Sequence, residues 1–220
     1  MISQRYSLTH YYHSAKTLAT GNFPVVVNLY VDYNCPYSAK IFPKFYNTVI
    51  PKLNEKYPGR FQFVYVNVIQ PWHTNSNLVN EFGIAYAKLL RENANDSVDS
   101  NRAFWELSRV LFEKIESFYD TSNIQLTRNE IYEQIYDVVS KELELVFPRE
   151  QILEQLVIKS SETPSNEGNA TATDVKYFTG YLRGVGVHVT PSVSVNGIVS
   201  DAISSGTPED ELIQIFEGAL

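Results

Sequence analysis

Two stretches of the chain are almost entirely apolar and predict the central strands of the fold. Residues 25–32 form a nearly continuous apolar run, and residues 61–68 alternate between apolar and polar positions in their first half. A continuous run is typical of a strand that other elements cover on both faces, and alternation indicates a half-buried strand. We therefore predict two core strands of an α/β protein.

The segment between these strands has the three- and four-residue spacing of an amphipathic helix. Its apolar face is formed by Ala39, Phe42, Tyr46, Val49 and Leu53. Pro36 suits the first helical turn, where a missing N–H has no effect. Pro43 falls inside the helix and is expected to kink it.

A long central stretch, from about residue 74 to residue 160, has no strand pattern. Apolar residues at helical spacing predict four amphipathic helices there, at 77–92, 101–119, 128–139 and 148–158. The next segment, 161–169, is rich in polar residues and helix breakers, and we expect it to form a mobile loop.

The C-terminal part returns to a mixed pattern of helix and strand. A helix is predicted over 173–183, ended by Gly184, and an alternating strand over 192–195. Asn196-Gly197 is a strong signal for a two-residue hairpin turn, so residues 198–199 are expected to form the return strand.

The two ends of the chain carry weaker patterns. Residues 6–20 predict an edge strand and a short helix, and residues 21–24 predict a turn. Near the other end, Thr207 is the predicted N-cap of a last helix, with Pro208 in its first turn.

Composition narrows the class of protein. The chain has 220 residues and a formal charge of −7, with no cluster of lysine and arginine, which argues against a nucleic-acid partner. The N-terminus lacks the apolar core of a signal peptide, and no apolar stretch is long enough to cross a bilayer. We therefore expect a cytoplasmic protein of one large domain or two small ones, without a membrane partner.

The chain has a single cysteine, Cys35, so it forms no intramolecular disulfide. Cys35 follows the first predicted core strand in the sequence Cys-Pro-Tyr-Ser, and a predicted helix follows it. A dithiol oxidoreductase would carry Cys-x-x-Cys at this place, and here Ser38 occupies the position of the second cysteine. The context therefore indicates a thiol site with limited chemistry.

Two motif regions and the order of the predicted elements carry a resemblance to a known family. The first region is Cys35-Pro36-Tyr37-Ser38 with a kink at Pro43, eight residues past the cysteine. The second, 184–197, has the sequence Gly-Val-Gly-Val-His-Val-Thr-Pro-Ser-Val-Ser-Val-Asn-Gly. With these features the chain resembles the thioredoxin superfamily, specifically its DsbA-like branch.

The resemblance implies an α/β thioredoxin-like fold with a mixed central sheet and an inserted helical subdomain. Its core would comprise residues 1–71 and 166–220, and the insertion residues 72–165. The resemblance also implies that Pro191 follows a cis peptide bond and lies beside Cys35. An extended peptide or glutathione would then pair with the exposed backbone of Thr190 as an added strand.

A cysteine at a helix N-terminus meets unpaired N–H groups that favour its thiolate. Such sites lower the pKa of a cysteine from about 8.5 to about 3.5–7.5. The leading hypothesis is a monothiol thiol–disulfide oxidoreductase that forms mixed disulfides with proteins or glutathione. Because Ser38 cannot release the bound partner, a second thiol such as glutathione would complete the cycle. The predicted site comprises catalytic Cys35 and Ser38, substrate-binding Pro36, Tyr37, Thr190 and Pro191, and His188 as a modulator of the thiolate.

Three other interpretations stay open. The protein could be redox-inactive and bind a peptide or partner chain in the groove beside Pro191. Kappa-class glutathione transferases share the DsbA-like architecture but activate glutathione with a serine near the position of Cys35, whereas this chain carries its serine three residues later. A lone cysteine can also be a small buried hydrophobic residue, although a strand-to-helix turn is expected to reach solvent.

Other polar residues carry weaker signals. Asp32 lies only three residues before Cys35, so it does not match the buried acid of thioredoxins. Pro71-Trp72-His73 follows the second strand, at the edge where open α/β sheets bind ligands. The four histidines are dispersed and form no zinc pattern with one cysteine, so neither a metal nor a tightly bound cofactor is expected.

Overall fold

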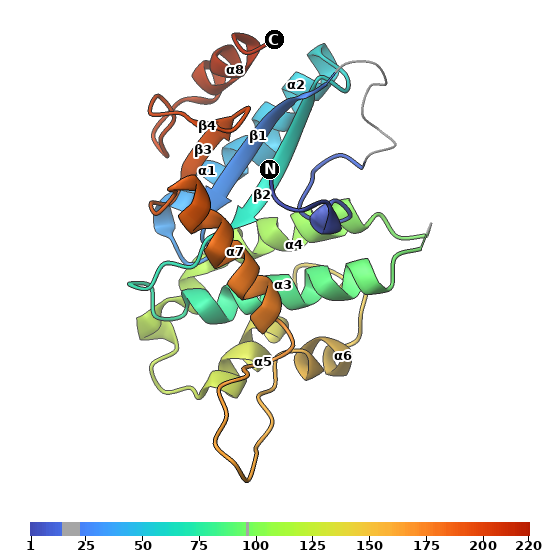
Figure 1. Cartoon of the computed structure of the whole chain (residues 1–220), viewed down its shortest axis with the longest axis vertical. Coiled ribbons are helices and arrows are strands. Elements are labelled where there is room, and N and C mark those ends of the chain that lie inside the picture. Colours follow the sequence, from blue (N-terminus) through green and yellow to red (C-terminus); the bar gives the residue numbers. More distant parts are fainter. Residues whose placement is uncertain (15–22, 96) are drawn as a thin grey trace.

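The computed structural model describes residues 1–14, 23–95 and 97–220 and contains a mixed four-stranded sheet (Figure 1). Its strands are β1 (Val25–Val31), β2 (Phe61–Asn67), β3 (Ser192–Val195) and β4 (Ile198–Val199), in the spatial order β2-β1-β3-β4. β1 pairs with β2 in parallel and with β3 antiparallel. The strands predicted from the two apolar runs and from the C-terminal alternation are therefore confirmed.

The register of these strands brings three distant segments to one edge of the sheet. Val31, the last residue of β1, pairs with Asn67, the last residue of β2. Since β3 runs the other way, its first residue, Ser192, pairs with Tyr30 near the same edge. The segments that follow β1 and β2 and the segment that precedes β3 therefore meet there.

The hairpin between β3 and β4 forms as its sequence predicts. Asn196 and Gly197 both have positive φ, at 50° and 87°. A two-residue turn of this kind needs two left-handed residues, which asparagine and glycine adopt most readily.

The helix after β1 runs through its internal proline. α1 (Pro36–Lys44) is followed by a π-helical segment (Phe45–Val49) and then by α2 (Ile50–Lys56). The irregular segment lies between Pro43 and Pro51, neither of which has an N–H to donate to the preceding turn. The kink predicted at Pro43 takes the form of this change in hydrogen bonding just beyond it.

The central stretch is helical, as predicted, with two elements shorter than expected. Its helices are α3 (Ser76–Glu92), α4 (Ser100–Glu113), α5 (Arg128–Val139) and α6 (Arg149–Glu154). The helix predicted over 101–119 ends at Glu113, and a 3₁₀ turn (Ile115–Phe118) then keeps Ile115 and Phe118 buried. The helix predicted over 148–158 stops at Glu154, before the exposed Val157 and Ile158. A second 3₁₀ turn spans Asp120–Ser122.

Two predicted helix ends in the C-terminal part were wrong. α7 (Ala172–Val185) continues through Gly184 and ends at Gly186, whose left-handed φ of 72° caps it. α8 (Glu209–Glu217) begins after Pro208, which is itself the N-cap because its ψ of 153° is extended. Thr207 instead accepts a hydrogen bond from the N–H of Ser204 through its hydroxyl. Residues 161–169 form neither helix nor strand, as predicted.

The N-terminal segment contributes less regular structure than its pattern predicts. A 3₁₀ helix spans Gln4–Tyr6, and Tyr11 forms an isolated antiparallel bridge with Val64 of β2, in place of an edge strand. Residues 15–22, which include most of the predicted short helix and half of the predicted turn, lie outside the described residues.

One hydrophobic cluster joins the sheet to the central helices. It includes Val27 and Phe63 from the strands and Phe104 and Tyr132 from α4 and α5, each at most 1% exposed. Figure 1 shows α3 to α6 gathered at one end of the sheet and α8 at the opposite end. The boundaries 72 and 165 of the inserted subdomain remain a prediction. None of the helices in the described ranges has the length and apolarity needed to span a membrane.

Candidate functional site

Cys35 occupies the N-cap of α1, directly after β1. Its backbone is extended, with φ −90° and ψ 118°, and its carbonyl accepts the first helical hydrogen bond, from Ala39 at 3.0 Å. The N–H of Cys35 donates to the carbonyl of Asp32 at 3.0 Å, which closes a tight turn between strand and helix. The sulfur therefore lies at the end of the helix where free N–H groups stabilise negative charge.

The sulfur contacts a segment 155 residues away in the sequence. Sγ of Cys35 donates to the carbonyl oxygen of Thr190 at 3.4 Å. The Thr190–Pro191 peptide bond is cis in the structure. The antiparallel pairing of β3 with β1 explains this meeting, because Pro191 directly precedes β3.

Cys35 is buried, with 3% of the residue exposed, whereas the sequence predicted an accessible sulfur. The expectation assumed that a strand-to-helix turn faces solvent. Here Thr190, itself 8% exposed, lies against the sulfur, and this contact could not be seen from the local sequence.

Ser38 lies one helical turn after Cys35 and is fully buried. Its hydroxyl oxygen accepts a hydrogen bond from the N–H of Asp32 at 3.3 Å. Ser38 was predicted to be catalytic, but among the described residues it forms no hydrogen bond with the Cys35 sulfur. Its observed role is to stabilise the turn between β1 and α1.

Asp32, which the sequence pattern gave little weight, is the centre of a buried polar network. Its carboxylate accepts hydrogen bonds from the Ser76 hydroxyl at 2.7 Å and from the Asn80 amide at 3.1 Å. It also accepts the N–H of Asn34 at 3.1 Å and lies 2.7 Å from Nδ1 of His73. Ser76 and Asn80 belong to α3, so this single carboxylate joins the cysteine turn to the central helices.

The network continues from Asn80 to the N-terminal segment. The Asn67 amide donates to Oδ1 of Asn80 at 2.9 Å, and Oδ1 of Asn67 lies 2.9 Å from Nε2 of His10. Burial lowers the pKa of His10 to about 3, so its imidazole is neutral near pH 7.

Gln70, after β2, fixes the segment that contains the cis bond. Its side-chain amide donates to the carbonyl of His188 at 3.0 Å and to the Thr190 hydroxyl at 3.3 Å. The Gln70 N–H donates to the Ser76 hydroxyl at 3.1 Å, which connects this segment to the Asp32 network. No feature of the local sequence identified Gln70, Ser76 or Asn80 as members of the site.

The fold and this arrangement can be compared with known proteins. The sequence matches no protein-family model and no curated protein. A proposed protein-disulfide isomerase from Pseudomonas syringae aligns with a TM-score of 0.64 at 21% identity, over 89% of this chain and 95% of that one. The chain has a DsbA-like thioredoxin fold.

Two further solved structures support the same fold. DsbG from Mycobacterium tuberculosis, a disulfide-bond oxidoreductase, aligns with a TM-score of 0.57 at 17% identity, over 94% of this chain and 85% of that one. DsbA from the same organism aligns with a TM-score of 0.56 at 16% identity, over 95% of this chain and 90% of that one. The resemblance stated from the two motif regions is thereby confirmed for the fold.

In this DsbA-like fold, His188 is exposed and lies outside any strand, and its Nδ1 lies 3.3 Å from the carbonyl oxygen of Gly186. Among the described residues its imidazole forms no hydrogen bond with Cys35, and its role as a modulator of the thiolate stays a prediction.

A pocket of about 280 Å³ opens beside the cysteine turn. It is lined by Asn34 and Pro36, which flank Cys35, by His73, and by Tyr119, Asp120 and Thr121. Three large side chains next to site residues are exposed, namely Tyr37 (64%), Trp72 (63%) and Val189 (54%). The region around the sulfur therefore offers a small pocket with apolar side chains nearby.

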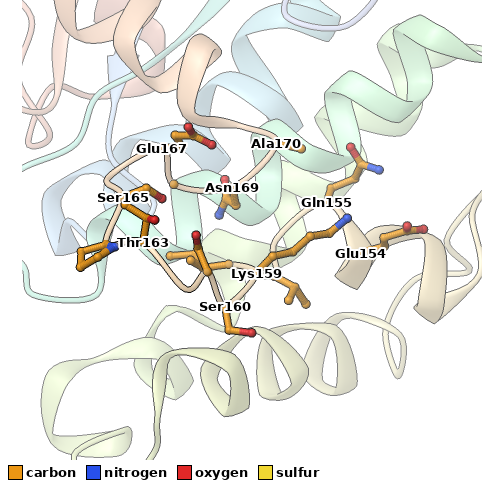
Figure 2. A pocket seen from close by; sticks show the side chains of 14 residues that line it. Glu154, Gln155, Lys159, Ser160, Thr163, Ser165, Glu167, Asn169 and Ala170 are labelled. Carbon is orange, nitrogen blue, oxygen red and sulfur yellow. The ribbon is translucent and has the colours of Figure 1, made fainter.

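A larger cavity lies elsewhere. It has a volume of about 810 Å³ and is lined only by residues between 154 and 170. Figure 2 shows it enclosed by that segment, with Gln155 and Lys159 on one side and Ser165 and Glu167 on the other. None of the predicted site residues lines it.

Burial raises the pKa of Asp32, although the hydrogen bonds from His73 and Ser76 oppose the rise. An aspartate in an unfolded chain ionises at about pH 3.9. Just above this pH, the folded protein keeps a proton that the unfolded chain has released. The contribution of Asp32 to stability therefore decreases as the pH rises above roughly pH 4, until Asp32 is ionised in the folded state as well.

We expect Asp32→Asn to be more stable than the wild-type protein near neutral pH, because asparagine keeps an acceptor oxygen without a buried charge. The difference in the free energy of unfolding between the variant and the wild-type protein should become smaller as the pH falls to about pH 4 and below. Urea denaturation of both proteins at several pH values measures it. A variant that is less stable at neutral pH, or a difference that does not change with pH, contradicts the prediction.

Proposed function

We propose that the protein is a thiol–disulfide oxidoreductase of monothiol type, with Cys35 as its nucleophile. The observation that carries the proposal is the contact between Sγ of Cys35, at the N-terminus of α1, and the Thr190–Pro191 segment. Two of the proteins that share the fold are named as disulfide oxidoreductases or isomerases, which supports the same class of reaction.

The proposed cycle has two exchange steps. The Cys35 thiolate attacks one sulfur of a protein disulfide or of a glutathione disulfide, a new sulfur–sulfur bond forms, and the second sulfur leaves and takes up a proton. Ser38 has no thiol, so the mixed disulfide persists until a second thiol attacks it. Glutathione is the proposed second thiol, and its attack releases Cys35 as thiolate.

Substrate binding must change the surroundings of the sulfur. In the structure the thiol donates to the carbonyl of Thr190, and ionisation of the thiol removes this donor. We propose that the backbone of a bound peptide or of glutathione pairs with Thr190 as an added strand and that Pro36, Tyr37 and Pro191 contact its side chains. Tyr37, at 64% exposure, is open to such a contact.

The proposal predicts that Cys35 of the folded protein reacts with iodoacetamide and forms an adduct with oxidised glutathione. The alkylation rate should reach half of its maximum well below pH 8, since a thiolate at a helix N-terminus is stabilised relative to a free thiol. Alkylation that is quenched at timed intervals over a series of pH values measures the first reaction. Intact-mass spectrometry detects the glutathione adduct. Because the chain has one cysteine, Cys35→Ser is the negative control for both reactions.

A redox-inactive protein that binds a peptide beside Pro191 is the second candidate, and the 3% exposure of Cys35 favours it. This candidate predicts a thiol that reacts in urea but not in the folded protein, or whose alkylation rate rises only near pH 8.5, the range of an ordinary cysteine. Such a result contradicts the oxidoreductase proposal.

A further inference from the structure

We propose that His73, held by Asp32, donates the proton to the sulfur that leaves when Cys35 attacks a disulfide. This inference rests on the proposed function and adds to it the acid of the exchange reaction. Neither residue belongs to the Cys-Pro-Tyr-Ser motif: Asp32 directly follows β1, and His73 lies in the segment between β2 and α3.

Asp32 is fixed to the cysteine turn by three hydrogen bonds. Its carbonyl accepts from the N–H of Cys35 at 3.0 Å, its N–H donates to the Ser38 hydroxyl at 3.3 Å, and its carboxylate accepts from the N–H of Asn34 at 3.1 Å. The Asp32 carboxylate therefore keeps a fixed position relative to the sulfur.

His73 is held against this carboxylate by one ring nitrogen. Nδ1 lies 2.7 Å from Oδ2 of Asp32, and the side chain is 21% exposed. Ionised Asp32 selects the tautomer with a proton on Nδ1 and stabilises the imidazolium. Within the described parts of the chain, Nε2 of His73 has no hydrogen-bond partner. Nε2 is thus the ring atom left for a bound molecule.

His73 shares a pocket with the two residues that flank Cys35. His73 lines the same 280 Å³ space as Asn34 and Pro36, the two neighbours of Cys35 in the chain. The other titratable groups on this pocket are Tyr119 and Asp120. Burial raises the pKa of Tyr119, so its phenol stays protonated near neutral pH, and Asp120 accepts a hydrogen bond from Thr74 at 3.1 Å. Among the side chains that line this pocket, His73 is therefore the one whose ring nitrogen is left to give and take a proton.

The proton that His73 gives up in the first exchange step is regained in the second. In the first step the Cys35 thiolate forms a bond with one sulfur of the disulfide, and the electron pair of the broken bond goes to the other sulfur. That sulfur takes the proton from Nε2 of His73, which becomes neutral. In the second step neutral His73 takes the proton of the incoming thiol, whose sulfur attacks the mixed disulfide, and Cys35 leaves as thiolate. The cycle ends with His73 protonated, and no oxidant or reductant beyond the two substrates is needed.

A test with two disulfides separates acid catalysis from a structural role. The thiolate of 5,5′-dithiobis(2-nitrobenzoate) is a weak base and leaves without a proton, whereas the alkyl thiolate of 2-hydroxyethyl disulfide is a strong base. We expect His73→Gln to react with the aromatic disulfide within about 2-fold of the wild-type rate. With the alkyl disulfide it should be slower by about 100-fold, the lower end of what a general acid contributes. Single-turnover rates of mixed-disulfide formation measure both.

Two further variants complete the experiment. Asp32→Asn, which should remain folded, is expected to show the same selective loss with a smaller magnitude, because the imidazolium loses its partner. His13→Gln is the matched control. Nε2 of His13 lies 2.9 Å from Oδ1 of Asn54, and the His13 backbone is bonded to the side chain of Gln62 near the start of β2, so both rates should be unchanged.

The outcomes are distinct. A loss of equal size with both disulfides, or no loss with the alkyl disulfide, overturns the role of His73 and leaves the role of Cys35 standing. A wild-type protein that reacts with neither disulfide overturns the proposed function itself, and with it this inference.

Discussion

Replacement of Ser38 by cysteine is expected to create a protein that closes an internal disulfide between Cys35 and the new sulfur under mild oxidant. Cys35 is the N-cap of α1 and Ser38 is the third residue of that helix. Side chains three residues apart on a helix have Cβ atoms about 5–6 Å apart, and a disulfide needs about 3.5–4.5 Å, so the extended N-cap backbone of Cys35 must supply the difference. The new sulfur would replace the Ser38 hydroxyl, which accepts a hydrogen bond from the N–H of Asp32.

The functional consequence should be a change from monothiol to dithiol chemistry. In Ser38→Cys the second thiol can attack the mixed disulfide at Cys35 and release the partner without glutathione. Thiol titration should find no free thiol after oxidation and two after reduction. The double variant Cys35→Ser/Ser38→Cys is the control, since it keeps the new cysteine and can form no internal bond. Persistence of two free thiols in oxidised Ser38→Cys contradicts the predicted geometry.

Removal of the Asp174 carboxylate is expected to be among the most destabilising single substitutions. Asp174, in the first turn of α7, is 3% exposed and contacts Arg91 of α3 at 2.9 Å. It also accepts the hydroxyl of Tyr6 at 2.8 Å and pairs with Arg5. Burial lowers the pKa of Arg91, and the Asp174 carboxylate opposes this effect by stabilising the charged guanidinium. The Asp174 carboxylate therefore joins the N-terminal segment, α3 and α7.

Asp174→Ala should lower the free energy of unfolding by about 3 kcal/mol. Breaking a buried ion pair by removal of one partner costs about 3–5 kcal/mol, and the lower end applies because Arg91 keeps 10% of its side chain in water. The pair with Arg5, half exposed, adds little. Urea denaturation gives the value.

Asp210→Ala is the matched control for Asp174→Ala. Asp210 also lies in the first turn of its helix and pairs with a cation, Lys52, at 3.4 Å, but its side chain is 85% exposed. Its loss should change the free energy of unfolding by less than about 1 kcal/mol. Similar effects at the two positions would mean that burial of Arg91 has no energetic importance.

The strands could be predicted because each depends on a local pattern, whereas the meeting of the two motifs was implied by the resemblance to the DsbA-like branch. The apolar runs predicted β1 and β2, and Asn196-Gly197 predicted the hairpin with both positive φ values. Helix interiors were predicted better than helix ends. Pro208 was assigned to the first turn of α8, and its extended backbone makes it the N-cap, which local propensity does not distinguish.

The polar part of the site could not be predicted, because its residues have no common local pattern. Asp32 lies in the turn after β1, His73 in the segment after β2 and Asn80 in α3, and each is an ordinary residue in its own segment. Asp32 lies only three residues before Cys35, so the sequence did not identify it as a buried acid. The turn between β1 and α1 nevertheless folds back and places Asp32 beneath the Cys-Pro-Tyr-Ser motif. The burial of Cys35 depends on Thr190, so it too is a tertiary property.

The segment that contacts the sulfur is short and has few attachments. It starts at Gly186, where α7 ends, and stops before Ser192, where β3 begins, and the Gln70 amide makes two bonds to it. An incoming peptide that pairs with the backbone of Thr190 would meet these two bonds first, so the residue at position 70 lies where it can affect access to the thiol without contacting the reacting atoms.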